Sequence, residues 1–173
     1  MAAAQQPTQS GRATDVAAAV CAAVFISVLA ISAYWDPTIR TLHVFEAIPY
    51  LAAGLLCLRR NRFGYALGVV SGAFWVWTAG FLTTFVRNGF AQLAILVRTG
   101  SVPRLDVLIA APAALATTGL AIFSLASYLR LPNKSWRDVG VLAVSLAAVP
   151  AFFLAIFKLF VPRYLAIFQR VFG

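Results

Sequence analysis

The sequence contains four long stretches without a charged residue, from residue 16 to 35, 63 to 86, 107 to 129 and 139 to 157. A helix needs about 20 mostly apolar residues to cross the hydrocarbon layer of a bilayer. The apolar residues in these stretches are continuous and do not alternate with polar ones, which favours helices over the strands of a membrane barrel. The sequence therefore predicts an all-α, multi-pass integral membrane protein.

A fifth apolar segment, residues 41–58, differs from the others because it carries His43 and Glu46 near its start. If its helix begins earlier, Asp36 becomes the N-cap and Pro37 the first residue, an arrangement that helix starts favour. We expect a bundle of about five transmembrane helices in one domain, residues 15–160, with spans at about 16–35, 41–58, 63–86, 105–130 and 139–160. Four spans are the alternative, if the second segment is broken or re-entrant.

Three further segments are too short or too polar to span. Residues 1–14 are predicted to be a flexible polar tail, with a cleavable signal peptide over the first 33 residues as the alternative. The uncharged stretch 88–97 is predicted to be interfacial or re-entrant. Residues 161–173 place Arg163 and Arg170 on one helical face, which is typical of a short amphipathic helix along the membrane surface. The alternative is that this segment extends the fifth span.

The composition agrees with a membrane protein. Of the 173 residues, 62% are apolar and 11% are charged, whereas a soluble domain has roughly 45–50% apolar and about 25% charged residues. A soluble globular enzyme, a disordered protein and a disulfide-stapled secreted domain are therefore excluded. We expect the chain in an inner or plasma membrane.

The basic residues lie between the apolar runs. Fourteen Lys and Arg against five Asp and Glu give a net charge of +9. Between membrane spans such residues lie among lipid phosphates, so the lipid bilayer is the expected partner and nucleic acid is not. The expected headgroup contacts are Arg59, Arg60, Arg62, Arg130, Lys134 and Arg137. Their two tight loops face one side, which the positive-inside rule makes cytoplasmic, although the total count of Lys and Arg is equal on the two sides.

Small residues recur at every fourth position on two of the predicted helices. The third span carries Gly64, Gly68 and Gly72, and the fifth carries Ala143, Ala147 and Ala151. In lipid, helices associate where small side chains let two backbones approach closely. We expect packing within the chain, with contact to other membrane subunits or a second copy as the alternative. Trp75 and Trp77, near the middle of the third span, are likewise expected to pack, with a cofactor, lipid or partner contact as the alternative.

One polar site lies within a predicted span. Glu46 is the acidic residue that lies clearly inside a span, and His43 is the chain's single histidine. Tyr50 follows Glu46 by four residues, so all three share one side of a helix. A carboxylate in hydrocarbon is costly and faces a cavity, a bundle interior or a basic partner. The three residues are candidates for a proton path, a headgroup site or a quinone contact; alternatively, the pair lies at the interface, bonded to Arg40 and water.

No metal or catalytic centre is predicted. One histidine and one glutamate make two ligands, whereas zinc sites take at least three from the protein. Haem would need His43 from two protomers, because the sequence offers no second axial ligand of that kind. Nucleophilic catalysis lacks a second histidine and a G-x-S-x-G context. No cofactor is expected; a lipid remains open, and haem or a quinone is less favoured.

Three classes of function remain. Packing surfaces with little intramembrane chemistry favour a small non-catalytic accessory or structural subunit of a membrane complex. The second class is an oligomeric proton-linked transporter or channel that uses Glu46 and His43, although five spans cannot form the equal halves of an inverted repeat. The third class is a membrane enzyme or redox subunit that binds a lipid-like substrate or a quinone near the same residues. An enzyme is less favoured than a protein without catalytic activity.

Overall fold

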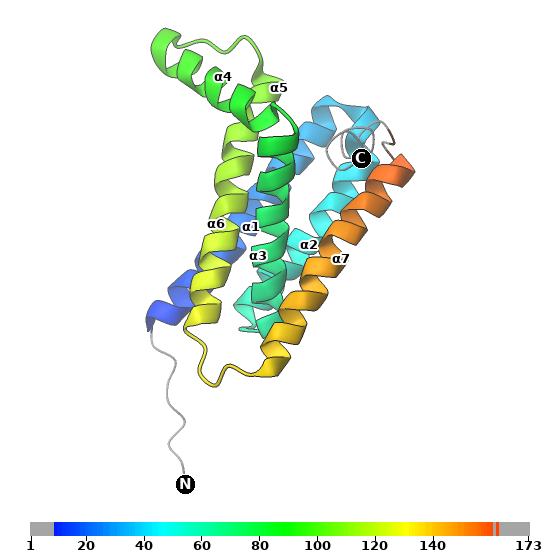
Figure 1. Cartoon of the computed structure of the whole chain (residues 1–173). Coiled ribbons are helices and arrows are strands. Elements are labelled where there is room, and N and C mark those ends of the chain that lie inside the picture. The colour runs from blue at the N-terminus through cyan, green and yellow to red at the C-terminus, as the bar shows by residue number, and fades with distance from the viewer. Residues whose placement is uncertain (1–8, 161, 163–173) are drawn as a thin grey trace.

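The computed structural model describes residues 9–160 and 162. Its elements are α1 (Gln9–Trp35), the 3-10 turn η1 (Pro37–Ile39), α2 (Arg40–Leu58), α3 (Arg62–Trp77), the π-helical turn η2 (Thr78–Leu82), α4 (Phe85–Thr99), α5 (Leu105–Leu108), α6 (Ala110–Leu129) and α7 (Trp136–Phe160) (Figure 1). The described residues contain helices and loops and no strand.

Five stretches of helix are long and apolar enough to cross a membrane. They are Arg12–Trp35, Pro37–Leu58, Arg62–Leu82, Leu105–Leu129 and Trp136–Phe160. The prediction of an all-α bundle with five such helices is confirmed. Because α1 begins at Gln9, residues 9–14 belong to this helix and not to the predicted tail. Residues 1–8 lie outside the described part of the chain, as does the predicted C-terminal amphipathic segment apart from Pro162.

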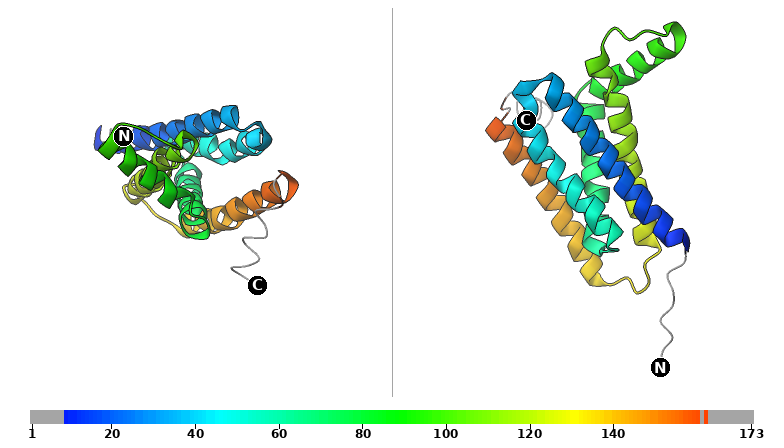
Figure 2. Two further views of the ribbon diagram at one scale, coloured as in Figure 1. Left: turned by 90° about the horizontal axis from the view of Figure 1, so that it is seen from above. Right: turned by 180° about the vertical axis from the view of Figure 1, so that it is seen from behind.

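Helix α3 lies at the centre of the bundle, where it contacts α2, α6 and α7, while α1 packs against both α2 and α6 (Figure 2). The start of α1, the α2–α3 turn and the α6–α7 loop gather at one end, called here the lower end as in Figure 1. The turns η1 and η2 and helix α4 gather at the opposite, upper end. As expected, Asp36 caps the start of the second span: its Oδ1 accepts the backbone N–H of Thr38 at 2.9 Å.

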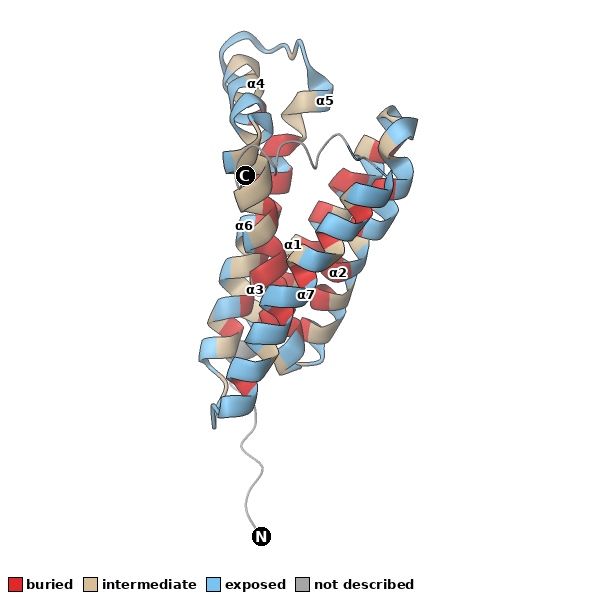
Figure 3. Ribbon diagram, turned by 45° about the vertical axis from the view of Figure 1, so that its right-hand side comes forward, coloured by how far each residue is buried: buried red, intermediate tan, exposed pale blue. Residues whose placement is uncertain are grey.

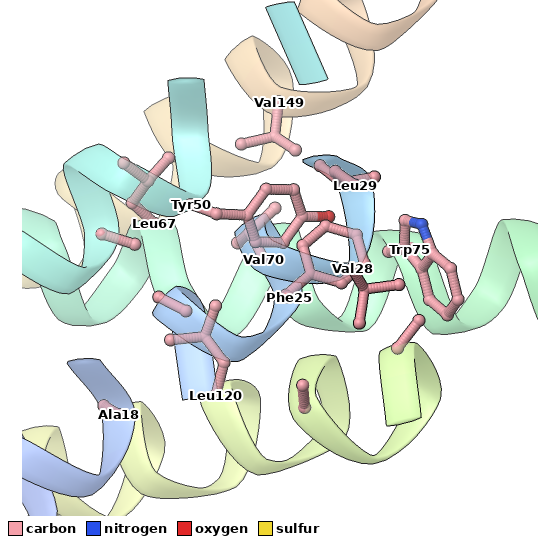
Figure 4. Packing of buried hydrophobic residues seen from close by; sticks show 14 of the residues in the cluster. Ala18, Phe25, Val28, Leu29, Tyr50, Leu67, Val70, Trp75, Leu120 and Val149 are labelled. Atoms are coloured by element: carbon pink, nitrogen blue, oxygen red, sulfur yellow. The ribbon is translucent and has the colours of Figure 1, made fainter. Parts of the chain in front are cut away.

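Aromatic side chains fill the centre of the bundle. Phe25 of α1, Tyr50 of α2 and Phe153 of α7 are almost completely buried, and the rings of Phe25 and Tyr50 lie side by side with centroids 4.3 Å apart (Figure 4). The outward faces of the helices are mostly exposed in the isolated chain and carry many large apolar side chains (Figure 3). This arrangement suits helices whose flanks contact lipid tails.

The two series of small residues lie in different surroundings. On α3, a methyl group added at Gly64 would meet Leu56 of α2, and one at Gly68 or Gly72 would meet Ser124 or the carbonyl oxygen of Thr117 on α6. The α3 glycines therefore lie at close helix contacts within the chain. The alanines of α7 are exposed on its outer face: Ala143, Ala147 and Ala151.

The third span ends earlier than the sequence predicts. Residues 63–86 form one uncharged run, but α3 gives way to η2 and the backbone becomes extended at Thr83, with φ −127° and ψ 168°. The Thr83 hydroxyl donates to the carbonyl of Ala79 at 2.8 Å and accepts the N–H of Phe85 at 3.2 Å. These two bonds satisfy backbone groups on both sides of the break, so the prediction of a helix to residue 86 is wrong.

Helix α4 extends beyond the upper end of the bundle (Figure 1). It contains the stretch 88–97 that the sequence singles out as interfacial or re-entrant, and it contacts η2, α5 and α6. Gly89 lies so close to α6 that an added methyl group would be 2.7 Å from the Cβ of Ala110. The helix stops at Gly100, whose positive φ of 71° is a conformation that glycine adopts without strain.

Polar contacts tie the lower end together. Asp15, which is buried, accepts bonds from Arg60 at 3.1 Å and from the Tyr65 hydroxyl at 2.8 Å. Arg62 donates to both oxygens of the buried Asp138, at 2.7 and 2.8 Å. Two of the six expected headgroup residues, Arg60 and Arg62, thus pair with acids of their own chain.

The other expected headgroup residues remain at the surface of the lower end. Arg59 and Arg137 are exposed. Arg130 donates to the hydroxyl of Thr14 at 3.2 Å, and Lys134 donates to the carbonyl of Leu129 at 2.9 Å. Headgroup contact by these four residues stays a prediction.

Candidate functional site

A cavity of about 820 Å³ opens at the upper end of the bundle. It is lined by residues from the last three turns of α1, η1, the start of α2, the end of α3 with η2, the start of α4, the α5–α6 junction and α7. Ligand sites of proteins have volumes of roughly 300–1,000 Å³ and combine apolar walls with a few polar groups. The walls of this cavity have that character, and its principal polar groups are Ser32, Asp36, His43, Glu46, Asn88 and Asp106.

A row of polar side chains in the cavity joins α1 to α2. His43 Nδ1 lies 2.9 Å from Glu46 Oε2, and His43 Nε2 lies 3.0 Å from Ser32 Oγ. A carboxylate accepts hydrogen bonds and donates none, so the ring proton belongs on Nδ1. Nε2 of the neutral ring is then an acceptor, which the Ser32 hydroxyl satisfies. The three side chains thus form a continuous hydrogen-bonded row, Ser32–His43–Glu46.

The position of this row follows from the turn between the first two spans. Ser32 lies in the last turn of α1, and its carbonyl accepts the N–H of Asp36 at 2.9 Å, directly before the cap of η1. The chain then reverses and α2 runs back along α1, which brings His43 beside Ser32. The side chains of His43 and Glu46 are 13% and 8% exposed, so the surrounding helices largely exclude water from their bond. Arg40 donates to the carbonyl of Ala33 at 3.4 Å and is not bonded to the pair.

Tyr50 is separate from this row. Its hydroxyl donates to the backbone carbonyl of Ser71 at 3.1 Å, and its ring packs between Phe25 and Phe153. The structure thus brings His43 and Glu46 together, as their spacing predicts, and places Tyr50 in the core, where it links α2 to α3.

Ser32 is the member of the row that sequence reasoning missed. It precedes His43 by eleven residues and lies on another helix, so no helical spacing connects them. The sequence feature that could have indicated Ser32 is the predicted helix start at Asp36 and Pro37. A reversal there places the last turn of α1 opposite the first turns of α2, and Ser32 is the serine in that last turn.

Aromatic side chains form much of the apolar wall. Phe25, Trp35, Trp75, Phe85, Phe153 and Phe157 line the cavity. Trp75 packs edge-on against Phe25, with ring centroids 5.2 Å apart. Of the two mid-span tryptophans, Trp75 therefore faces the cavity, while Trp77 packs against Phe74 with ring centroids 6.1 Å apart.

The π-helical turn η2 forms another part of the wall. Thr78, Ala79 and Leu82 line the cavity together with Thr83 and Thr84. The hydroxyls of Thr78 and Thr83 donate to carbonyls of their own chain segment, at 3.0 and 2.8 Å. Single π-helical turns inside α-helices are frequent at functional sites, because they displace side chains from regular helical positions.

The cavity is acidic although the chain is strongly basic. Among the described residues that line it are Asp36, Glu46 and Asp106, and neither Lys nor Arg. Asp106 is bonded through both carboxylate oxygens to Arg104, at 2.7 and 3.0 Å. These hydrogen bonds, with the attraction of the carboxylate charge, raise the pKa of the Arg104 guanidinium, so this exposed pair stays ionised. Glu46 has the His43 ring as its partner.

The described residues contain no group of three or more His, Cys, Asp or Glu side chains placed to hold a metal ion. The chemistry of the cavity thus rests on a hydroxyl, an imidazole and a carboxylate in contact, beside an apolar space large enough for an organic molecule. Comparison of the chain with protein-family models, curated proteins and solved structures found no match.

Proposed function

We propose that this protein binds a lipid-like amphiphile in the cavity at its upper end. The observation that carries the proposal is the combination of a space of about 820 Å³, walls rich in aromatic and aliphatic side chains, and one compact polar row, Ser32–His43–Glu46. The apolar walls suit a hydrocarbon chain, whose burial is favourable by about 0.8 kcal/mol per CH₂ group. The polar row suits a headgroup that exchanges hydrogen bonds.

The proposal is tested by filling the cavity. Ala79 lines it and is partly buried, so an Ala79→Trp variant places an indole in the space. Ala148 lies on the exposed face of α7, so Ala148→Trp adds the same side chain where the cavity is unaffected. The protein is purified in a mild detergent and titrated with a glycerol monoalkyl ether, and bound molecules are counted by native mass spectrometry.

We expect one ether molecule to bind to the wild-type protein and to Ala148→Trp, and at least about tenfold weaker binding to Ala79→Trp, which corresponds to about 1.4 kcal/mol. Equal binding to all three proteins would place the amphiphile on the outer surface and overturn the proposal. The same spectra identify lipids or proteins that remain bound after purification.

A second candidate function is that of a non-catalytic accessory subunit in an inner or plasma membrane. The α3 glycines favour GxxxG-type packing inside the chain, whereas Ala143, Ala147 and Ala151 lie on an exposed face of α7. Such a face suits close approach by a helix of another membrane subunit or of a second copy. A subunit that co-purifies with the wild-type chain and is lost from Ala147→Leu would support this candidate, and a monomer free of other proteins would count against it.

A proton-linked transporter or channel remains a third proposal. Its support is that His43 and Glu46, two groups that exchange protons, line a cavity at one end of the bundle. In liposomes, Glu46→Gln would then abolish a proton-coupled flux.

A further inference from the structure

Ser32, His43 and Glu46 are joined in the order of a nucleophile, a base and an orienting acid. His43 contacts the serine hydroxyl through Nε2 at 3.0 Å and the glutamate through Nδ1 at 2.9 Å. Serine hydrolases on unrelated folds use this order, with the same ring nitrogens in the same roles. We propose that these residues form a catalytic triad that cleaves an ester of the bound amphiphile. This inference rests on the proposed function, because the cavity must hold the substrate.

The hydroxyl of Ser32 contacts a histidine ring, whereas other hydroxyls of these helices bond to carbonyl oxygens, to a thiol or to another hydroxyl. Ser27 on α1, Thr117 on α6 and Ser145 on α7 each donate to the carbonyl four residues earlier, at 2.8–2.9 Å. That bond within the helix is the usual arrangement for serine and threonine away from water. Ser32 instead contacts the ring of a histidine on the neighbouring helix. Its hydroxyl is therefore placed to lose its proton to a base.

The surroundings of the three side chains fit their roles. All three line the cavity. Ser32 is partly exposed, so a substrate can reach its Oγ, whereas the Glu46 side chain is 8% exposed. A buried carboxylate on Nδ1 fixes the tautomer that leaves Nε2 free to accept a proton, and it stabilises the imidazolium that forms during the reaction. Asn88 donates one amide hydrogen to Thr84 Oγ1 at 3.2 Å, which leaves its second amide N–H for a carbonyl oxygen in the cavity.

The proposed reaction has two steps. Ser32 Oγ attacks the ester carbonyl carbon while its proton passes to His43 Nε2, and the bond from that carbon to the alcohol oxygen breaks as the alcohol takes this proton. Water then attacks the acyl carbon while His43 accepts a water proton. The bond between this carbon and Ser32 Oγ breaks, and His43 returns the proton to Ser32 Oγ. The products are a carboxylic acid and an alcohol, and water is the one co-reactant.

The lining indicates the class of ester. Six aromatic side chains and several aliphatic ones form the walls, which suits a long acyl chain. Among the described lining residues there is no Lys or Arg to pair with a phosphate or a carboxylate, and Glu46 repels both. The substrate class is therefore a fatty acyl ester of an alcohol that carries no negative charge.

The direct test is covalent labelling of the purified protein with an alkyl fluorophosphonate. In this reaction a bond forms between Ser32 Oγ and phosphorus, fluoride leaves, and His43 takes the proton. We expect one adduct, located on Ser32 by peptide mass spectrometry, and its loss in Ser32→Ala. Ser27→Ala, which removes a hydroxyl from the same helix, is the matched control and is expected to label like wild type.

The base and the positioning acid are tested by labelling rates. His43→Gln removes the base and is expected to slow labelling about 10²–10⁴-fold. Glu46 acts through His43, so Glu46→Gln is expected to slow labelling, while Glu46→Asp restores part of the rate because its carboxylate still accepts from Nδ1. A merely structural Glu46 would show equal rates for Gln and Asp at equal thermal stability.

The outcomes separate this inference from the proposed function. The glycerol monoalkyl ether has no ester bond, so it measures binding alone. If the ether binds in the cavity and the fluorophosphonate leaves Ser32 unlabelled in correctly folded protein, the triad is wrong and the binding function stands. If the adduct forms on another residue, the triad is likewise overturned. Hydrolysis of p-nitrophenyl octanoate that is lost in Ser32→Ala supports the inference, and unchanged hydrolysis contradicts it.

Discussion

At the scale of single residues, the fold depends on places where a methyl group does not fit. A Cβ at Gly72 would meet the Thr117 carbonyl oxygen and would lie 3.1 Å from the Cβ of Ala121. The obstructing oxygen belongs to the backbone of α6, so relief requires the two helices to separate. Gly140 on α7 has open space around it.

This difference gives a prediction for two matched substitutions. Gly72→Ala is expected to lower the free energy of unfolding by about 1–3 kcal/mol, because it overpacks the α3–α6 contact. Gly140→Ala is expected to raise the same quantity by roughly 0.5–1 kcal/mol, because alanine loses less backbone entropy in a helix. Thermal unfolding in detergent measures both. Equal effects would show that α3 and α6 are not in close contact.

Residue spacing was sufficient for two of the three residues in the polar row. His43 and Glu46 are one helical turn apart, so the sequence alone predicts their contact. Ser32 was beyond prediction by spacing, because its position beside His43 depends on how α1 and α2 pack after the chain reverses. Tyr50 shares the helical side of Glu46, but its ring fits among Phe25 and Phe153 and its hydroxyl bonds to α3. The positions of Ser32 and Tyr50 both depend on tertiary packing, which residue spacing does not describe.

At the scale of elements, the apolar runs of the sequence predict the five long helices of the bundle. They do not predict where the third of these helices ends. Thr83 and Thr84 are uncharged and continue the run, so composition gives no sign of a break. The break depends on the two bonds of the Thr83 hydroxyl and on the contact of α4 with α6. It also shapes the cavity, because η2 and the start of α4 form part of its wall.

The connection between α6 and α7 depends on one arginine from another element. Arg62, at the start of α3, donates to both oxygens of Asp138 and to the carbonyls of Pro132 and Asn133. Because Asp138 is buried, removing its partner leaves an uncompensated charge, a change that is strongly destabilising. The loop would then lose its attachment to α3.

Limited trypsin digestion tests this attachment. Arg62→Ala is expected to increase the rate of cleavage after Lys134 by about tenfold, which corresponds to about 1.4 kcal/mol of easier local opening. Arg59→Ala is the matched control, because it also removes one tryptic site from the α2–α3 turn. Arg59 is exposed and does not contact Asp138, so cleavage after Lys134 is expected to stay at the wild-type rate. Cleavage at the same rate in both variants would show that the loop is held by other contacts.

At the scale of the whole molecule, the two ends of the bundle differ in their polar chemistry. The lower end is closed by the pairs Asp15–Arg60 and Asp138–Arg62, each with a buried acid. The upper end holds the cavity, and the described residues that line its walls include three acids and neither Lys nor Arg. Five helices are long and apolar enough to cross a membrane, so we expect the two ends to lie on opposite sides of the bilayer and the proposed ligand to enter the cavity at the upper end.

Two serines report this topology. Ser101 lies in the α4–α5 loop at the upper end, Ser135 lies in the α6–α7 loop at the lower end, and both are exposed. In a chain whose Cys21 and Cys57 lie within spans, Ser101→Cys and Ser135→Cys introduce thiols at the two surfaces. Because its two tight loops are basic, we expect the lower end to lie in the cytoplasm by the positive-inside rule. A membrane-impermeant maleimide added to intact cells is therefore expected to label Ser101→Cys and to leave Ser135→Cys unlabelled until the cells are opened.

Two other outcomes would contradict this topology. If both thiols are labelled from outside, the two loops lie on the same side of the membrane. If Ser135→Cys alone is labelled, the orientation is the reverse and the cavity faces the cytoplasm.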